Sequence, residues 1–211
     1  MLQKENDMEF NTALLEWINE PKEYSIKDNR IEITTEPGTD LWQRTYYKFR
    51  NDNAPMLQMQ TDEKEFSFSV KTNFNSNNNF DQSGIILYLN SENWIKASVE
   101  YGNEKDAFLG SVVTNRGYSD WSTTRISNNI KELWFRLSRR GNDFCVEVSY
   151  DGVIFEHIRI CHLFEANDII NFGIYACSPE NGAFKATFTD FELGECKWAL
   201  HTGQQPDEDF A

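Results

Sequence analysis

One stretch of the chain alternates apolar residues with residues that could do chemistry. Between positions 94 and 101, Trp94, Lys96 and Glu100 alternate with apolar neighbours. Successive side chains of a β-strand point to opposite faces, so these three residues would share the face opposite the core. An indole ring can stack on a sugar ring, while amino and carboxylate groups hydrogen-bond its hydroxyls. The pattern fits a binding face, and it fits equally a solvated surface with ordinary cross-strand ion pairs.

Three further segments bring similar residues. Segment 40–46 would place a tryptophan, an arginine and a tyrosine on one strand face, and segment 81–88 begins with polar residues. In segment 111–122 a turn would bring an arginine, an aspartate and a tryptophan together. The candidate ligand-binding residues are Trp42, Arg44, Gln82, Tyr88, Trp94, Lys96, Glu100, Arg116, Asp120 and Trp121.

Structural roles compete with binding at several of these positions. Lys96 and Glu100 lie four residues apart on one strand, about 13 Å, so they cannot pair directly. Asp120 and Asp81 each lie at a loop, where an aspartate commonly accepts backbone N–H bonds. Trp94 and Trp121 are large enough simply to cover an end of the fold. For each single residue, a structural role is the stronger expectation.

Catalytic motifs are absent from the sequence, and no catalytic residue is predicted. The chain has no nucleophile elbow, zinc-protease helix, phosphate-binding loop or dinucleotide fingerprint. The E-x-D-x-E pattern at residues 5–9 has the carboxylate order of laminarinase-type hydrolases, but its polar terminal setting indicates chance. A glycoside hydrolase needs two carboxyl groups about 5 to 9.5 Å apart. Glu100 with Asp120 or Asp81 is the combination to test.

Cofactors and metals are not expected either. The four cysteines, at positions 145, 161, 177 and 196, contain no CxxC pair, which argues against a zinc site. No acidic loop has clear calcium-ligand spacing. We expect free thiols that are mostly buried as small apolar groups.

The chain has 211 residues, a formal net charge of −14 and a pI of about 4.6. That charge argues against nucleic acid and anionic membrane surfaces as partners, because both would repel it. No signal peptide is recognisable, and no apolar run approaches the roughly 20 residues of a membrane span. We expect a cytoplasmic protein.

The sequence predicts almost entirely strands as the elements that position these residues. The exceptions are a short helical turn at 12–18 and another turn near 162–166. Asp151-Gly152 suits a tight type I′ hairpin, and Gly102-Asn103 and Gly141-Asn142 mark further reversals. Strands without intervening helices favour a two-sheet sandwich. The expected strands are 30–35, 41–49, 57–59, 65–74, 83–89, 94–101, 107–114, 122–126, 132–139, 143–150, 153–160, 169–177 and 183–193. We expect one domain over residues 1–198 and an acidic, flexible tail over 199–211.

Six segments, taken in order, resemble a known family. They read TDLWQRT, FDQSGIILYL, ENWIKASVEY, SVVTNRGYSDWS, SYDGVIF and YACSP. The family has no assigned function, includes the regulation-of-enolase proteins and belongs to the concanavalin A-like lectin/glucanase superfamily. The resemblance covers roughly residues 14 to 195. It implies an all-β jelly-roll sandwich of two curved antiparallel sheets, with ligands on the concave sheet or at its rim.

Three functions follow as hypotheses. The first is a non-catalytic binding module whose concave face takes a carbohydrate or similar polyhydroxylated ligand. The second is a regulatory module that binds a protein partner, an enzyme of central metabolism, and it is motivated by the family resemblance alone. The third and weakest is a glycoside hydrolase or lyase that uses Glu100.

Overall fold

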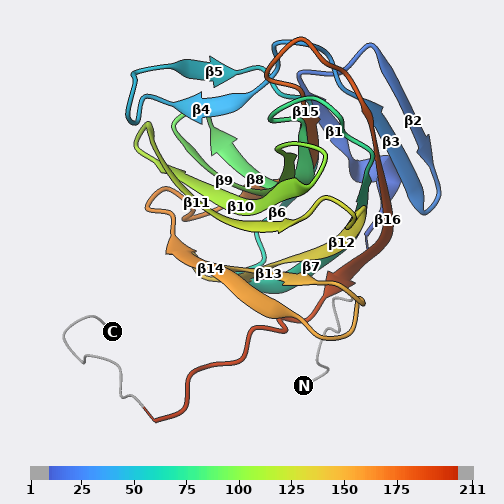
Figure 1. Ribbon diagram of the computed structural model, residues 1–211. Coiled ribbons are helices and arrows are strands. Elements are labelled where there is room, and N and C mark those ends of the chain that lie inside the picture. Colours follow the sequence, from blue (N-terminus) through green and yellow to red (C-terminus); the bar gives the residue numbers. More distant parts are fainter. Residues whose placement is uncertain (1–9, 204–211) are drawn as a thin grey trace.

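A computed structural model describes residues 10–203 of the chain. The E-x-D-x-E pattern and most of the predicted acidic tail therefore lie outside the described residues. After a single 3₁₀ turn at Thr12–Leu14, sixteen strands form two large antiparallel sheets and one small two-stranded ribbon (Figure 1). The predicted all-β jelly-roll sandwich is confirmed.

Each large sheet has seven strands. The first sheet runs, in spatial order, β1 (Glu16–Ile18), β6 (Met56–Thr61), β15 (Ile170–Cys177), β8 (Gln82–Asn90), β9 (Asn93–Tyr101), β10 (Asp106–Asn115) and β11 (Tyr118–Ser127). The second sheet runs β14 (Glu156–His162), β13 (Asp143–Ser149), β12 (Glu132–Arg140), β7 (Glu65–Phe74), β16 (Lys185–Gly194), β3 (Arg30–Thr34) and β2 (Glu23–Lys27). The ribbon pairs β4 (Leu41–Gln43) with β5 (Arg50–Asp52).

The main core fills the space between the two sheets. On β9 the inward residues Ile95, Ala97 and Val99 are all buried in this core, as the alternation of the sequence predicts. Phe144 and Val146 of β13 do the same from the second sheet. Burial of this apolar surface on both inner faces is the main force that holds the sandwich together.

A second, smaller apolar cluster lies on the other face of the first sheet, under the ribbon. Leu41 of β4 packs there against Ile86, Trp94 and Tyr175 of the sheet. The sheet bends around the ribbon in Figure 1, and we call this side its concave face. Part of the concave face is therefore a packed interior, which leaves only the remainder for ligands.

The predicted strand 41–49 is wrong beyond residue 43. Arg44, Tyr46 and Lys48 all have positive φ, between 55° and 75°, and the chain turns there instead of continuing as a strand. An extended strand cannot contain left-handed residues at alternate positions. The predicted common face of Trp42, Arg44 and Tyr46 therefore does not form.

The predicted type I′ hairpin at Asp151-Gly152 is also wrong. Strand β13 ends at Ser149 and β14 begins only at Glu156. The Asp151 carboxylate accepts N–H bonds from Val153 at 2.8 Å and Ile154 at 2.9 Å. Such an aspartate-centred turn stabilises a wider loop, because it satisfies backbone donors that a two-residue hairpin would use between strands. The reversal predicted at Gly141-Asn142 is confirmed, because Arg140 pairs with Asp143 across these two residues.

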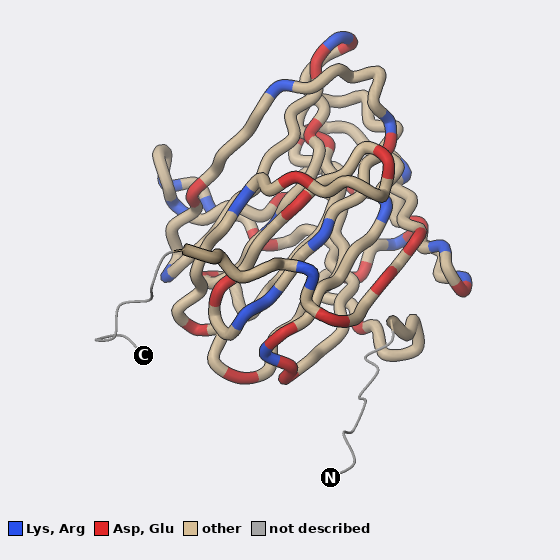
Figure 2. Tube along the Cα trace, turned by 90° about the horizontal axis from the view of Figure 1, so that it is seen from below, with Lys and Arg blue, Asp and Glu red and all other residues tan. Residues whose placement is uncertain are grey.

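Charges are mixed over the surface on the side of the second sheet. Figure 2, viewed from below Figure 1, shows Lys and Arg interspersed with Asp and Glu along the strands. All four cysteines are free; Cys145 and Cys177 are buried, while Cys161 and Cys196 are partly exposed. Within residues 10–203, no helix has the length and apolar character needed to cross a membrane.

Candidate functional site

An open cavity of about 850 Å³ lies on the concave face beside the ribbon. Its floor comes from β8, β9 and β10 of the first sheet, one wall from the loop that joins β4 to β5, and the opposite wall from β11. Its lining residues are Asp40, Trp42, Thr45, Tyr46, Tyr47, Phe49, Phe80, Gln82, Lys96, Glu100, Val112, Ser119, Asp120, Trp121, Pro179 and Glu180. The size is in the range of small-molecule sites.

Gln82, Lys96 and Glu100, which we call the polar floor, lie at the bottom of this cavity. The Lys96 ammonium donates to Gln82 Oε1 at 2.9 Å and pairs with Asp40 Oδ1 at 3.5 Å. The Tyr175 hydroxyl donates to the same Gln82 oxygen at 2.9 Å. Lys96 is only 3 % exposed, so its charge is neutralised and largely hidden by the protein itself.

Glu100 differs from the other two floor residues because its side chain forms no hydrogen bond with a described residue. It is 6 % exposed, and within the described part of the chain its carboxylate has no hydrogen-bond partner. Burial raises the pKa of Glu100 to about 7; the positive charge of Lys96 opposes this rise and the negative charge of Asp40 adds to it. Near neutral pH this carboxyl group can therefore either donate or accept a hydrogen bond.

Aromatic side chains form the sides of the cavity. We call Trp42, Tyr47, Phe49 and Trp121 the aromatic wall. The Tyr47 ring stacks on Phe49 at 5.6 Å and on Trp42 at 6.3 Å, and Trp42 meets Trp121 edge to face at 6.4 Å. Trp121 is 45 % exposed and Tyr47 is 58 % exposed. Large aromatic surface thus stays accessible above the polar floor.

Trp94 does not belong to this wall, and the prediction that it stacks on a ligand is wrong. Its side chain is fully buried under the ribbon in the smaller apolar cluster. Its indole N–H donates to the Ser91 carbonyl at 3.2 Å. The alternation of β9 does point Trp94 to the concave face, but the ribbon covers that end of the strand.

Three further predicted binding residues hold the surrounding structure together instead of lining the cavity. Tyr88 donates from its hydroxyl to Asp52 of β5 at 2.7 Å, which ties the sheet to the ribbon. Arg44 donates to the Gly117 carbonyl at 2.9 Å and pairs with Glu92 at 2.8 Å. The Arg116 guanidinium lies over the Phe164 ring at 4.5 Å.

Asp120 lies in the cavity lining, but its carboxylate is engaged elsewhere. It pairs with Arg159 of β14 at 3.0 Å. In the register of β10 and β11, Asp120 lies opposite the core residue Val113, whereas Trp121 lies opposite Val112 on the concave face. The predicted loop before residue 122 is thus already strand, so Asp120 and Trp121 point to opposite sides of β11.

Asp81 has the structural role that its loop position predicts. Its Oδ2 accepts backbone N–H bonds from Asn77 at 3.4 Å and Asn78 at 3.0 Å, which orders the asparagine-rich loop. Neither aspartate that the sequence suggested as a partner for Glu100 is therefore a free carboxylate facing it across the cavity.

Several lining residues escaped the sequence analysis. Tyr47 and Phe49 come from the turn that was expected to be a strand, and Pro179 and Glu180 follow the end of β15. The run YYKF at 46–49 is a signal that could have been used, because three aromatic residues so close together can form an exposed apolar patch, which often marks a binding site. Asp40 lies one residue before β4 and was not among the predicted binding residues.

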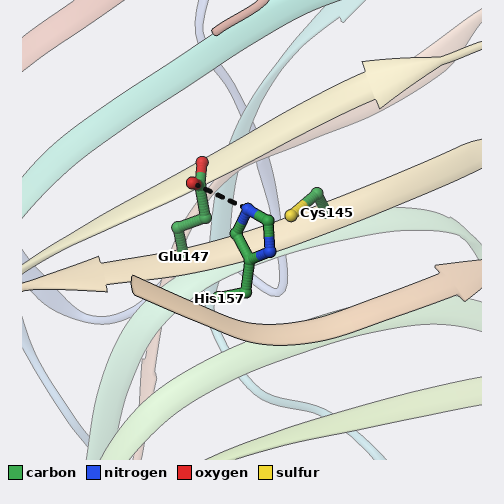
Figure 3. A group of neighbouring side chains, drawn as sticks. All are labelled: Cys145, Glu147 and His157. Carbon is green, nitrogen blue, oxygen red and sulfur yellow. Dashed lines mark ion pairs between the residues drawn. The ribbon is translucent and has the colours of Figure 1, made fainter. Parts of the chain in front are cut away.

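A separate group of possible metal ligands lies on the second sheet (Figure 3). Cys145, Glu147 and His157 bring a thiol, a carboxylate and an imidazole within 4.8 Å of one another, a set that zinc can use. Glu147 already accepts a bond from Arg136 at 2.6 Å and pairs with His157 at 3.3 Å. The strand register aligns Arg136, Glu147 and His157 in one row across β12, β13 and β14. A metal ion there would compete with Arg136, and a cross-strand charge ladder accounts for the group.

Comparison with known proteins gives a family and a fold. Residues 17–196 match the model of a family described as protein of unknown function (DUF1349). The chain is 31 % identical over 185 residues to Regulation of enolase protein 1 of Saccharomyces cerevisiae, covering 87 % of this chain and 91 % of that protein.

Solved structures agree with this result. The crystal structure of a functionally unknown protein from Saccharomyces cerevisiae superposes with a TM-score of 0.81 at 28 % identity, over 88 % of this chain and 98 % of that one. A mutant of the GH43 protein BlXynB from Bacillus licheniformis reaches a TM-score of 0.70 at 16 % identity, over 90 % of this chain and 38 % of the other. The second likeness shows the concanavalin A-like fold and nothing further.

Proposed function

From the premise that this chain belongs to the DUF1349 family of proteins of unknown function, we propose that it is a non-catalytic binding module. Its ligand is a carbohydrate or a similar polyhydroxylated molecule, bound in the cavity on the concave face. The family fixes no activity, so the proposal depends on the site itself. The observation that carries it is the exposed aromatic wall above a buried polar floor.

The chemistry of the cavity suits a sugar in two ways. Trp121 and Tyr47 offer accessible ring faces, on which the C–H side of a pyranose can stack. Below them, the Glu100 carboxyl group has free hydrogen-bonding capacity, and hydroxyl groups can fill it. A few polar groups that converge below apolar walls are what fixes the orientation of a small ligand.

A titration against a panel of oligosaccharides tests the proposal, with tryptophan fluorescence and calorimetry as readouts. We expect a subset of the panel to quench or shift the emission, and Trp121→Ala to weaken binding by roughly tenfold or more, since stacking of an aromatic ring is worth about 1 to 3 kcal/mol per partner. Tyr150→Ala is the matched control, because Tyr150 is an exposed aromatic (52 %) outside the cavity.

Trp94→Ala is unsuitable as the control, because it would open a hole in the smaller apolar cluster. If the panel produces neither heat nor a fluorescence change, the proposal is wrong. Equal losses in Trp121→Ala and Tyr150→Ala would show that binding occurs outside the cavity.

A second candidate function is regulation of a metabolic enzyme through protein contact. Its support is the name of the yeast relative, Regulation of enolase protein 1. The exposed rings of Tyr46 (96 %) and Tyr47 would be the contact surface. We would mix the purified protein with purified enolase and measure complex formation by light scattering; an additive signal without a complex would reject this candidate for that enzyme.

We propose a cytoplasmic location for the protein under either candidate function. The four free cysteines support it, because disulfides are rare in that compartment. A hydrolase or lyase remains the weakest candidate, since the Asp120 carboxylate pairs with Arg159 and Asp81 does not line the cavity. Unchanged activity in Glu100→Gln, should the protein degrade any glycan of the panel, would exclude Glu100 as its acid.

A further inference from the structure

The cavity carries an excess of negative charge. Among the described residues that line it, Lys96 alone is basic, while four carry carboxylates: Asp40, Glu100, Asp120 and Glu180. Asp40 balances Lys96, and Arg159 balances Asp120 from outside the lining. Glu180 is exposed and accepts a bond from Asn79 at 3.1 Å. Glu100 is buried and forms no ion pair with a described residue, and the Lys96 charge offsets its burial only in part.

Anionic ligands find no suitable partner in this lining. The Lys96 ammonium is covered and already bonded to Gln82 and Asp40. The Arg44 guanidinium is committed to Glu92 and the Gly117 carbonyl. A carboxylate or phosphate entering the cavity would therefore meet Glu100 without an available counter-charge, which is strongly unfavourable in a partly buried site.

Cationic ligands meet the opposite situation. The rings of Trp42, Tyr47 and Trp121 line the cavity, and the negative π faces of such rings attract organic cations. In its ionised form, the buried Glu100 carboxylate supplies a negative charge below them. The net charge of −14 on the whole chain also raises the local concentration of cations.

We propose that the ligand of this cavity carries a positively charged nitrogen, an organic ammonium group, that binds between the Glu100 carboxylate and the aromatic wall. This inference rests on the proposed function, because it names the charge of the ligand of the same cavity. Taken together, the proposed function and this inference describe a polyhydroxylated molecule with an ammonium group, of which amino sugars are the simplest class.

The test uses two small probes that differ only in charge. Choline has a quaternary nitrogen, and 3,3-dimethyl-1-butanol has a carbon atom in its place. We would titrate each into the full-length protein and follow the indole N–H signals of Trp42 and Trp121 by NMR. At pH 8 we expect choline to bind about tenfold more tightly than its neutral isostere, the ratio expected for one charged contact.

Two variants assign the charge preference to a residue. Glu100→Gln keeps the shape of the side chain and should abolish the preference. Glu104→Gln removes an exposed carboxylate outside the cavity and should retain it. Equal affinities of the wild-type protein for both probes, or a preference that survives Glu100→Gln, would overturn the proposal.

The wild-type protein alone provides a second readout. The charged or titratable groups that influence Glu100 or respond to it are Lys96 of β9, Asp40 before β4, and Tyr175 and Cys177 of β15. Choline affinity should rise about fivefold between pH 6 and pH 8, as Glu100 loses its proton, while the affinity of the isostere stays constant. A flat choline profile contradicts the proposal. Oligosaccharide binding without a charge preference would leave the proposed function intact.

Discussion

The Glu100 carboxyl group lies below the cavity with 6 % of the residue exposed, and burial raises its pKa to about 7 from an ordinary value of 4.5. A raised pKa in the folded state means that folding favours the protonated form. The ionised form is therefore a cost to stability, which accumulates as the pH rises from about 4.5 to about 7 and persists above it.

Glu100→Gln should remove this cost. At pH 8 we expect the free energy of unfolding of the variant to exceed that of the wild-type protein, by an amount on the order of 3 kcal/mol if the side chain stays dry. At pH 4.5 the two proteins should differ little. Urea denaturation at several pH values measures the difference, and Glu180→Gln, at an exposed position, should show no such trend.

At the scale of elements, the ribbon and its loop decide what the concave face can do. Strands β4 and β5 cover one end of the sheet and bury Trp94, while the loop between them carries Tyr47 and Phe49 to the cavity. The loop is held from outside the ribbon, because Arg44 reaches the β10–β11 turn at Gly117 and pairs with Glu92 between β8 and β9.

Arg44→Met should loosen this loop without unfolding the sandwich. The apolar stem remains, but both contacts of the guanidinium are lost, and we expect amide hydrogen exchange to accelerate in residues 44–49 and oligosaccharide affinity to fall several-fold. Arg30→Met is the matched control, because Arg30 pairs with Glu32 at 2.7 Å on the distant β3. Unchanged exchange in 44–49 would show that the Arg44 contacts do not hold the loop.

Sequence periodicity predicted the sheets better than the site, for a physical reason. Alternation along β9 reflects the local geometry of one strand, and it assigned Ile95 and Val99 to the core correctly. Whether Trp94 is exposed depends on the ribbon, which is distant in sequence, so no local pattern can report it. Likewise, the pairing of Asp120 with Arg159 forms between two sheets and leaves no trace in either segment.

At the scale of the whole molecule, the sequence predicted the architecture but missed its shortest strands. The count and alternation of strands, with the family resemblance, were sufficient for the two-sheet sandwich. The short strands β1, β2 and β5 were missed, because three to five residues at the margins of sheets are too short for a clear period. These strands complete the sheets and the ribbon but add little to the main core.

The burial of the thiols offers a test of the whole fold. Cys145 and Cys177 are fully buried, and burial raises the pKa of Cys145 to about 12 and that of Cys177 well above its usual range. We expect iodoacetamide to modify the partly exposed Cys196 first, and Cys161 more slowly, because burial raises the pKa of Cys161 to about 12 as well. Cys145 and Cys177 should react only at the rate of global unfolding, as mass spectrometry of labelled peptides would show. Rapid native labelling of Cys177 would contradict the packing under the ribbon.

The edge-to-face contact of Trp42 and Trp121 at 6.4 Å joins two indoles from separate parts of the fold, one on the ribbon and one on β11. Indole transitions at this separation couple to each other, and the coupling depends on their mutual angle. Circular dichroism of the unlabelled protein should therefore contain an exciton signal from this pair. Since both rings line the cavity, a ligand that shifts either ring should change this signal.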